Sequence, residues 1–306
     1  MAPQRKALTL FEDYHGMMSD SIRMQAYEKA IEHAVKPGDI VVDLGAGLGI
    51  LSLLAVRAGA ARVYAIEKSD SIELAKEIAR KNGASERIIF VRDNSKNVSL
   101  DTKADVLISE TMGSFGLDEN TLDFTIDARD RLLKPGGKMV PETVTPWLAP
   151  VETPGDFEKF TFWKDVLGFD FAPAQDELLA RMSLVDIEPQ QLLAQARALG
   201  SFDLREVNEV HSANKLLFSM TRPGIIHGLA GWFEVQLCPG VDITTAPGAA
   251  TTHWRQAFFP VREQISIIEG DLMEVSFSIG PKAELSDDTT ISYNYRCTQL
   301  ANERKR

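Results

Sequence analysis

The chain has 306 residues, which is enough for two ordinary domains or one large domain with an ample core. Its hydrophobic content of 44% and charged content of 25% are typical of a soluble globular protein. The formal net charge of −11 argues against nucleic acid as the main partner and would suit a cationic substrate.

The cysteine content and the N-terminal residues restrict the cellular compartment that we expect for the protein. Cys238 and Cys297 are the only cysteines, too few and too far apart to suggest a disulfide framework or a zinc site, so we expect no metal. Residues 1–8 are polar and basic without the apolar segment of a secretory signal, and no apolar run approaches membrane-spanning length. We therefore expect a cytoplasmic protein that binds neither membranes nor nucleic acid.

The first predicted elements are helices. Residues 7–35 carry apolar side chains at helical spacing, which predicts one or two helices that end at residues 36–38. The β-branched run 39–42 then predicts a buried strand, and the apolar run 50–58 predicts a helix. Between them lie glycines at alternate positions, Gly45, Gly47 and Gly49. Strand, glycine turn and helix together are typical of a nucleotide-binding βαβ unit.

Two acids strengthen this interpretation. Asp43 lies at the end of the first strand, and Glu67 follows a second strand, 62–66, at the place where an acid binds the ribose hydroxyls of a nucleotide. The glycine spacing is G-x-G-x-G rather than the dinucleotide pattern G-x-G-x-x-G. It favours S-adenosylmethionine, which has no pyrophosphate, so a methyltransferase is preferred over a nicotinamide enzyme.

The rest of the chain divides into two parts. A helix over 71–81, strands over 88–91 and 104–109 and a helix over about 118–133 continue the alternation, which demands a parallel sheet covered by helices on both faces. From about residue 143, alternating runs of strand length predict a second, all-β domain, sandwich or barrel. We expect N-terminal helices at 1–38, the parallel-sheet domain at 39–142, and the β domain at 143–306 with an inserted helical segment at about 156–186.

Two carboxylates frame the loop after the fourth strand. Glu110 closes that strand at the sheet edge where open α/β folds bind ligands, and Glu119 follows nine residues later. A loop of this length can fold back so that the two carboxylates face one another across a cation. The alternative is that Glu119 is a surface acid in the first turn of a helix, and periodicity alone favours that alternative.

Motifs in a fixed order resemble those of the protein arginine methyltransferases. Residues 109–113 with Glu119 resemble the double-glutamate loop of that family, residues 252–254 its Thr-His-Trp loop, residues 11–14 its N-terminal helix and residues 163–170 its dimerisation arm. The resemblance runs from about residue 10 to near the C-terminus. It implies a Rossmann-like domain that binds S-adenosylmethionine, a following β-barrel domain with an inserted helical dimerisation arm, and a homodimer.

The resemblance also implies catalytic roles. Glu110 and Glu119 would hold an arginine guanidinium by charge-assisted hydrogen bonds and steer one nitrogen toward the methyl group of S-adenosylmethionine. His253 and Asp20 would form the His–Asp pair of the family, which ties the β domain to the N-terminal helix and relays the released proton. The expected activity is N-methylation of arginine in a protein or peptide.

Other residues are expected to contact the cofactor or the substrate. Arg23 would pair with the carboxylate of S-adenosylmethionine, and Trp254 would stack on the substrate guanidinium. The expected cofactor-binding residues are Phe11, Tyr14, Arg23, Asp43, Gly45, Gly47, Gly49 and Glu67, and the expected substrate-binding residues are Met17, Met112 and Trp254.

Several positions depart from the family pattern. Thr111 and Ser114 replace the usual tryptophan and tyrosine of the double-glutamate loop, which predicts a smaller or more open pocket. Lys96 stands where the family places a glutamate beside adenine, so no adenine contact is assigned. Two alternatives follow: methylation of free arginine or another small guanidino metabolite, and a catalytically silent dimeric binding module.

Overall fold

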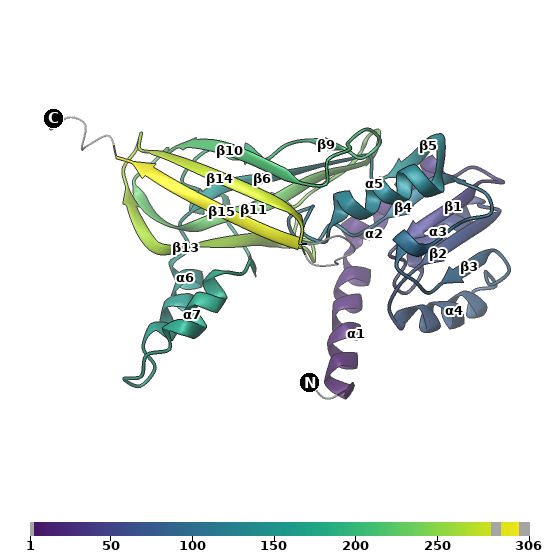
Figure 1. Ribbon diagram of the computed structural model, residues 1–306, viewed down its shortest axis with the longest axis horizontal. Helices are drawn as coiled ribbons and strands as arrows, with labels where there is room; N and C mark the ends of the chain where they lie inside the picture. Colours follow the sequence, from purple (N-terminus) through teal and green to yellow (C-terminus); the bar gives the residue numbers. More distant parts are fainter. Residues whose placement is uncertain (1–2, 283–288, 300–306) are drawn as a thin grey trace.

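The computed structural model describes residues 3–282 and 289–299, with side chains from residue 11 onward. Two helices, α1 (Pro3–Ser19) and α2 (Ser21–Ala34), precede a parallel-sheet half, and a long antiparallel half follows it (Figure 1). Asp20 separates the two helices and caps α2, because its side chain accepts a hydrogen bond from the Arg23 N–H. Since α2 contacts α3 (Ile50–Ala58) of the parallel-sheet half as well as β11 (Gly224–Cys238) and β12 (Val241–Thr244) of the antiparallel half, it joins the two halves.

The parallel sheet has the strand order β3-β2-β1-β4-β5. Its elements alternate along the chain: β1 (Ile40–Leu44), α3 (Ile50–Ala58), β2 (Arg62–Ile66), α4 (Ser71–Lys81), β3 (Ile88–Val91), β4 (Ala104–Ser109), α5 (Thr121–Leu132) and β5 (Leu133–Val140). The strands are mostly apolar because helices cover the sheet. The strand order reverses between β1 and β4, and ligands of such sheets bind beside the carboxyl ends of the strands at that point.

The helix expected over about 118–133 is shorter than expected. It begins at Thr121 and ends at Leu132, and the Lys-Pro-Gly-Gly run at 134–137 belongs to β5 instead of ending the helix in a loop. Pairing with β4 explains the difference. Leu133 pairs with Ala104, the register then shifts, and Lys138 pairs with Val106, so the run at 134–137 forms a bulge within a strand.

The antiparallel half contains two sheets, one with the order β7-β13-β11-β6-β8 and one with the order β10-β14-β15. In addition, β12 pairs with β11 and β9 pairs with β6. The strands are β6 (Thr143–Val151), β7 (Ser183–Val185), β8 (Arg197–Ala198), β9 (Phe202–Asp203), β10 (Ser212–Ser219), β11 (Gly224–Cys238), β12 (Val241–Thr244), β13 (Gln256–Ile267), β14 (Leu272–Pro281) and β15 (Thr289–Thr298). An α/β half followed by an all-β half, as expected, is confirmed.

The two halves share a hydrophobic core. Phe115, from the loop after β4, is fully buried and packs against Phe259 of β13 and Phe277 of β14, with ring centroids 5.2 and 5.5 Å away. One cluster of buried residues therefore extends from the parallel sheet into the β domain. The loop that starts at Glu110 is anchored in both halves.

A helical segment projects from the β domain (Figure 1). It contains α6 (Pro154–Thr161) and α7 (Ala172–Leu179) and ends before β7, which pairs with β13. The expected segment of about 156–186 therefore includes a short strand at its end. Among the described residues, we find no helix that combines the length and the apolar character needed to cross a membrane.

Candidate active site

A cavity of about 400 Å³ lies at the carboxyl ends of β1, β2 and β4. Its walls come from α1, α2, the glycine turn after β1 and the loop after β4. The predicted site residues that line it are Tyr14, Met17, Arg23, Gly45, Gly47, Glu67, Glu110 and Glu119.

Gly45 and Gly47 form the wall of the cavity that follows β1. Both have positive φ, 75° and 54°, which glycine adopts without strain. A Cβ at Gly45 would lie 3.0 Å from Thr111 Cγ2, and a Cβ at Gly47 would lie 3.1 Å from the Tyr14 ring. Glu67 is held against this turn, because its carboxylate accepts a hydrogen bond from the Gly47 N–H at 3.0 Å. The turn therefore keeps a bare backbone and an acid side by side.

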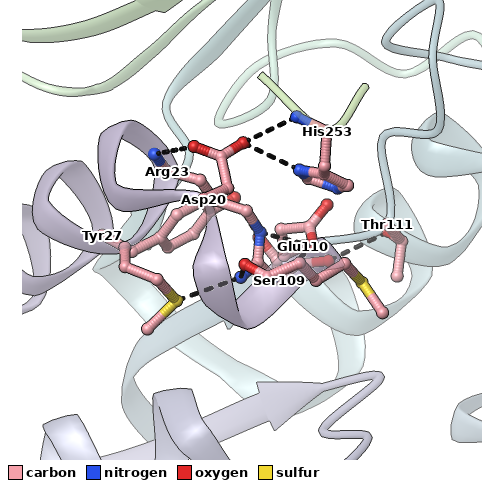
Figure 2. Close-up of polar contacts among 9 residues, drawn as sticks. Asp20, Arg23, Tyr27, Ser109, Glu110, Thr111 and His253 are labelled. Atoms are coloured by element: carbon pink, nitrogen blue, oxygen red, sulfur yellow. Dashed lines mark hydrogen bonds and ion pairs between the residues drawn. The ribbon is translucent and has the colours of Figure 1, made fainter. Parts of the chain in front are cut away.

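Asp20 connects the N-terminal helices to the β domain (Figure 2). Its Oδ1 accepts a hydrogen bond from the Arg23 backbone N–H, and its Oδ2 lies 2.9 Å from both the backbone nitrogen and the ring Nδ1 of His253. Burial alone would raise the pKa of Asp20, but these hydrogen bonds outweigh burial and the pKa lies below its ordinary value. The expected His–Asp contact is present, and neither residue is among those that line the cavity.

Arg23 forms a buried ion pair with Glu110, which lies next to it in Figure 2. Its Nη2 and Nε donate to Glu110 Oε2 at 2.5 and 3.1 Å, and the two side chains are only 5% and 9% exposed. The Tyr27 hydroxyl donates to the Ser109 carbonyl at 3.0 Å and so fixes the end of β4. The resemblance implies a partner for Arg23 in the cofactor carboxylate. In the structure Arg23 pairs with Glu110 instead, so the Glu110 carboxylate already binds one guanidinium, that of Arg23.

Glu119 faces the same cavity from the other end of the loop. Glu119 keeps solvent exposure although protein atoms surround much of it, and its pKa is raised to about 7, chiefly by desolvation and then by the negative charges of Glu110 and Asp118, while Lys68 acts in the opposite direction. The two carboxylates thus differ, because Glu110 is paired with Arg23 and Glu119 titrates near neutrality. A cation that reached both would gain paired, charge-assisted hydrogen bonds.

Three residues expected to contact the cofactor lie away from the cavity lining. Phe11 is 53% exposed, because α1 carries it away from the sheet edge beyond Tyr14. Asp43 is fully buried within β1, where the Ser52 hydroxyl donates to its Oδ2 at 2.6 Å. Gly49 caps the N-terminus of α3 with φ 82°. Its backbone serves the helix start rather than the cavity.

Two residues expected to contact the substrate are buried in the core instead. Met112 is fully buried, because the chain turns sharply at Gly113, whose φ is 61°. Trp254 is 3% exposed and packs edge-on against Phe233, with ring centroids 5.3 Å apart. It also contacts His253, at 4.3 Å between centroids. Trp254 therefore supports the His253 loop in this structure and does not wall the cavity.

Some lining residues were not expected, and Phe124 is the clearest case. It lies near the start of α5, where an apolar side chain is typical of core packing. Lys96 lies 5.7 Å from its ring and forms an ion pair with Asp123 at 2.6 Å. The only signal in the sequence is the position of Phe124 on a helix that starts at the ligand edge of the sheet. The other unexpected lining residues include Met18, Lys68 and Thr111.

Family profiles match most of the chain. Residues 144–299 match the arginine methyltransferase oligomerization subdomain, and residues 25–139 match the ribosomal protein L11 methyltransferase (PrmA). Protein arginine N-methyltransferase 1.1 of Arabidopsis thaliana is 32% identical over 295 residues, covering 93% of this chain and 75% of that protein. Protein arginine N-methyltransferase 1 of Saccharomyces cerevisiae is 32% identical over 300 residues, covering 93% and 86%.

Solved structures show the same similarity. A chain of the Trypanosoma brucei PRMT1 enzyme–prozyme heterotetrameric complex with AdoHcy has a TM-score of 0.83 at 27% identity, covering 94% of both chains. Protein arginine methyltransferase 10 of Arabidopsis thaliana has a TM-score of 0.79 at 28% identity, covering 94% of this chain and 93% of that one. The chain therefore belongs to the protein arginine N-methyltransferase family.

Proposed function

We propose that the protein transfers the methyl group of S-adenosylmethionine to a guanidino nitrogen of arginine in a protein or peptide, and that Glu110 and Glu119 hold that guanidino group. One observation carries the assignment of the two glutamates. A single cavity contains both the glycine turn with Glu67 and the two glutamates at the ends of the loop after β4. A nucleoside and a guanidinium bound there would share one cavity, as methyl transfer between two bound molecules requires.

The residues around the glycine turn fit S-adenosylmethionine. Gly45 and Gly47 leave the backbone bare where a nucleoside would lie, and Glu67 presents a carboxylate suited to ribose hydroxyls. Asp43 Oδ1, next to the turn, is a buried carboxylate oxygen without a hydrogen-bond partner among the described residues. When bound, the cofactor supplies an electrophilic methyl group and leaves as S-adenosylhomocysteine. The Trypanosoma relative was solved with AdoHcy, which agrees with this fit.

The two glutamates would bind and orient the substrate. A guanidinium is protonated at any working pH and is a poor nucleophile until its charge is drawn to one side. Arg23 occupies Glu110 Oε2, whereas Oε1 accepts no hydrogen bond from any described residue. Glu110 Oε1 would therefore bind one nitrogen of the guanidinium and Glu119 the terminal nitrogen that attacks, and the hydrogen bonds to the two carboxylates would raise the electron density on that nitrogen.

The attacking nitrogen loses a proton as it gains the methyl group, and Glu119 is the better placed acceptor. Glu119 lines the cavity and its pKa is raised to about 7, whereas His253 contacts Asp20 outside the lining. We assign proton acceptance to Glu119 and release to water in the cavity. In this proposal the His253–Asp20 pair ties the β domain to α2, and Glu119 takes the place of that pair in accepting the released proton.

We also propose a homodimer formed through the segment around α6 and α7. Phe162, Leu167 and Phe169, which all lie between α6 and α7, are 57%, 93% and 68% exposed, so a monomer would leave three large apolar side chains in water. This segment lies within the part of the chain that matches the arginine methyltransferase oligomerization subdomain. A second copy that covers these side chains explains both observations.

A competition assay separates a protein substrate from a small one. A Gly-Arg-rich peptide is incubated with radiolabelled S-adenosylmethionine, with and without a large excess of free arginine. Labelling of the peptide that free arginine does not suppress supports the proposal. Suppression by free arginine would favour a small guanidino substrate. Calorimetric binding of S-adenosylmethionine without label in any arginine substrate would contradict the proposal.

A further inference from the structure

The loop that carries the two glutamates is held from inside by an acid with no assigned role. Asp118 directly precedes Glu119, and its carboxylate points back into the loop. Oδ1 accepts a hydrogen bond from the Phe115 N–H at 2.7 Å, and Oδ2 accepts one from the Ser114 N–H at 3.1 Å. Gly113 leaves room for it, because a Cβ there would lie only 2.5 Å from Asp118 Oδ2.

Other contacts fix the rest of the loop, so Asp118 controls one defined part of it. Phe115 is anchored in the shared core, and the Thr121 hydroxyl donates to the Thr111 carbonyl at 2.6 Å. The Thr121 hydroxyl also donates to the Gly116 carbonyl at 3.0 Å. Among the described residues, Asp118 is the one side chain that accepts hydrogen bonds from the backbone N–H groups of Ser114 and Phe115. Asp118 itself is not among the cavity-lining residues.

We propose that Asp118 is a positioning residue for arginine methylation, which acts through Glu119: it sets the loop so that Glu119 faces Glu110, and its charge adds to theirs behind the guanidinium site. This role rests on the proposed function of Glu110 and Glu119. The side chain that closes the loop is thus also a third carboxylate, behind the two that would hold the cation, and burial raises the pKa of Asp118 itself to about 6. Asp118 thus has two effects: it positions the loop, and it adds negative charge. A neutral side chain of the same shape would keep part of the positioning and lose the charge.

The effect of the Asp118 charge can be measured through the pKa of Glu119. Burial raises the pKa of Glu119 most, the charges of Glu110 and Asp118 raise it further, and Lys68 lowers it. Arg23 and Glu67 line the same cavity, and both are already bonded, Arg23 to Glu110 and Glu67 to Gly47 N–H. Removal of the Asp118 charge should therefore lower the pKa of Glu119. The acid limb of the rate profile should move to lower pH.

The test is Asp118→Asn, with Asp101→Asn as the matched control. Asp101 is exposed, forms no hydrogen bond or ion pair with the described residues, and undergoes the same change in charge. For Asp118→Asn we expect kcat for an arginine peptide to fall by about tenfold or more, since small misplacements of reacting groups cost this much. We expect the acid limb of kcat to move down by roughly half a pH unit. Binding of S-adenosylhomocysteine, measured by calorimetry, should stay within about twofold of wild type.

A double variant distinguishes positioning from general damage. In a Glu119→Gln background, residual rates are measured under single-turnover conditions, and Asp118→Asn should lower them by less than about twofold if it acts through Glu119. Additive losses, an unshifted acid limb, or an unchanged kcat for Asp118→Asn would overturn the role of Asp118. Wild-type protein that labels no arginine substrate would instead overturn the proposed function.

Discussion

Replacement of Glu110 by Gln tests how strongly the Arg23–Glu110 ion pair holds the catalytic end of β4. Both side chains are more than nine-tenths buried, and two Arg23 nitrogens donate to one Glu110 oxygen. Breaking a buried pair costs about 3–5 kcal/mol, because the remaining charge is left unpaired. Gln keeps an acceptor oxygen, and Arg23 keeps its hydrogen bond to the Met17 carbonyl. We therefore expect Glu110→Gln to lower the free energy of unfolding by about 2–3 kcal/mol.

Equilibrium urea unfolding followed by circular dichroism measures this loss. With a slope of roughly 3 kcal/mol per molar urea for a chain of this size, the midpoint should fall by nearly 1 M. Glu77→Gln is the control, because its exposed pair with Arg80 should contribute nothing measurable. An Arg23→Met/Glu110→Met variant leaves no buried charge and should be more stable than Glu110→Gln. An unchanged midpoint for Glu110→Gln would refute the reasoning.

Three further substitutions test the N-cap of α2, the buried carboxyl of Asp43 and the proposed dimer interface. Asp20→Ala should lower the free energy of unfolding by about 1–2 kcal/mol in urea, because α2 loses its N-cap, and Asp20→Asn should recover part of this. Burial raises the pKa of Asp43 to about 6, so below that pH the folded protein holds a proton that the unfolded chain lacks. The contribution of Asp43 to stability should therefore grow as the pH falls from about 7 to about 4, so the melting temperature of wild type should rise relative to that of Asp43→Asn over this range; a constant difference between the two proteins would contradict the buried charge. Phe169→Asp should convert a sedimenting dimer to monomer, whereas Leu217→Asp, on exposed β10, should leave it intact, and an unchanged mass for Phe169→Asp would count against the interface.

Local patterns in the sequence predict the framework of the site. The strands expected at 62–66 and 104–109 and the helix expected at 71–81 coincide with β2, β4 and α4, because each is an apolar or amphipathic run bounded by turn residues. Glu67 and Glu110 then reach one edge of the sheet, since parallel strands present their carboxyl ends together. The glycine turn follows from its spacing. These features depend on residues close in sequence.

Contacts between distant segments explain what the sequence does not predict. The Arg23–Glu110 pair joins residues 87 positions apart, and it requires α2 to lie across the end of β4. Met112 lies between two site residues in the sequence, yet the turn at Gly113 leaves it in the core. Phe124 has the pattern of a core residue and still lines the cavity. The periodicity of apolar residues shows which face of a helix or strand is buried. It does not show whether that face packs against the core or lines a cavity.

Methyl transfer by Glu119→Gln tests the central claim most directly. The variant keeps the shape of the side chain and removes its charge, and Glu86→Gln, at an exposed position, is the control. Wild type and both variants are offered radiolabelled S-adenosylmethionine with a Gly-Arg-rich peptide, free arginine or a lysine peptide. We predict label in the arginine peptide with wild type and Glu86→Gln, and a loss of about 100-fold or more with Glu119→Gln. Equal labelling by Glu119→Gln and wild type would contradict the account.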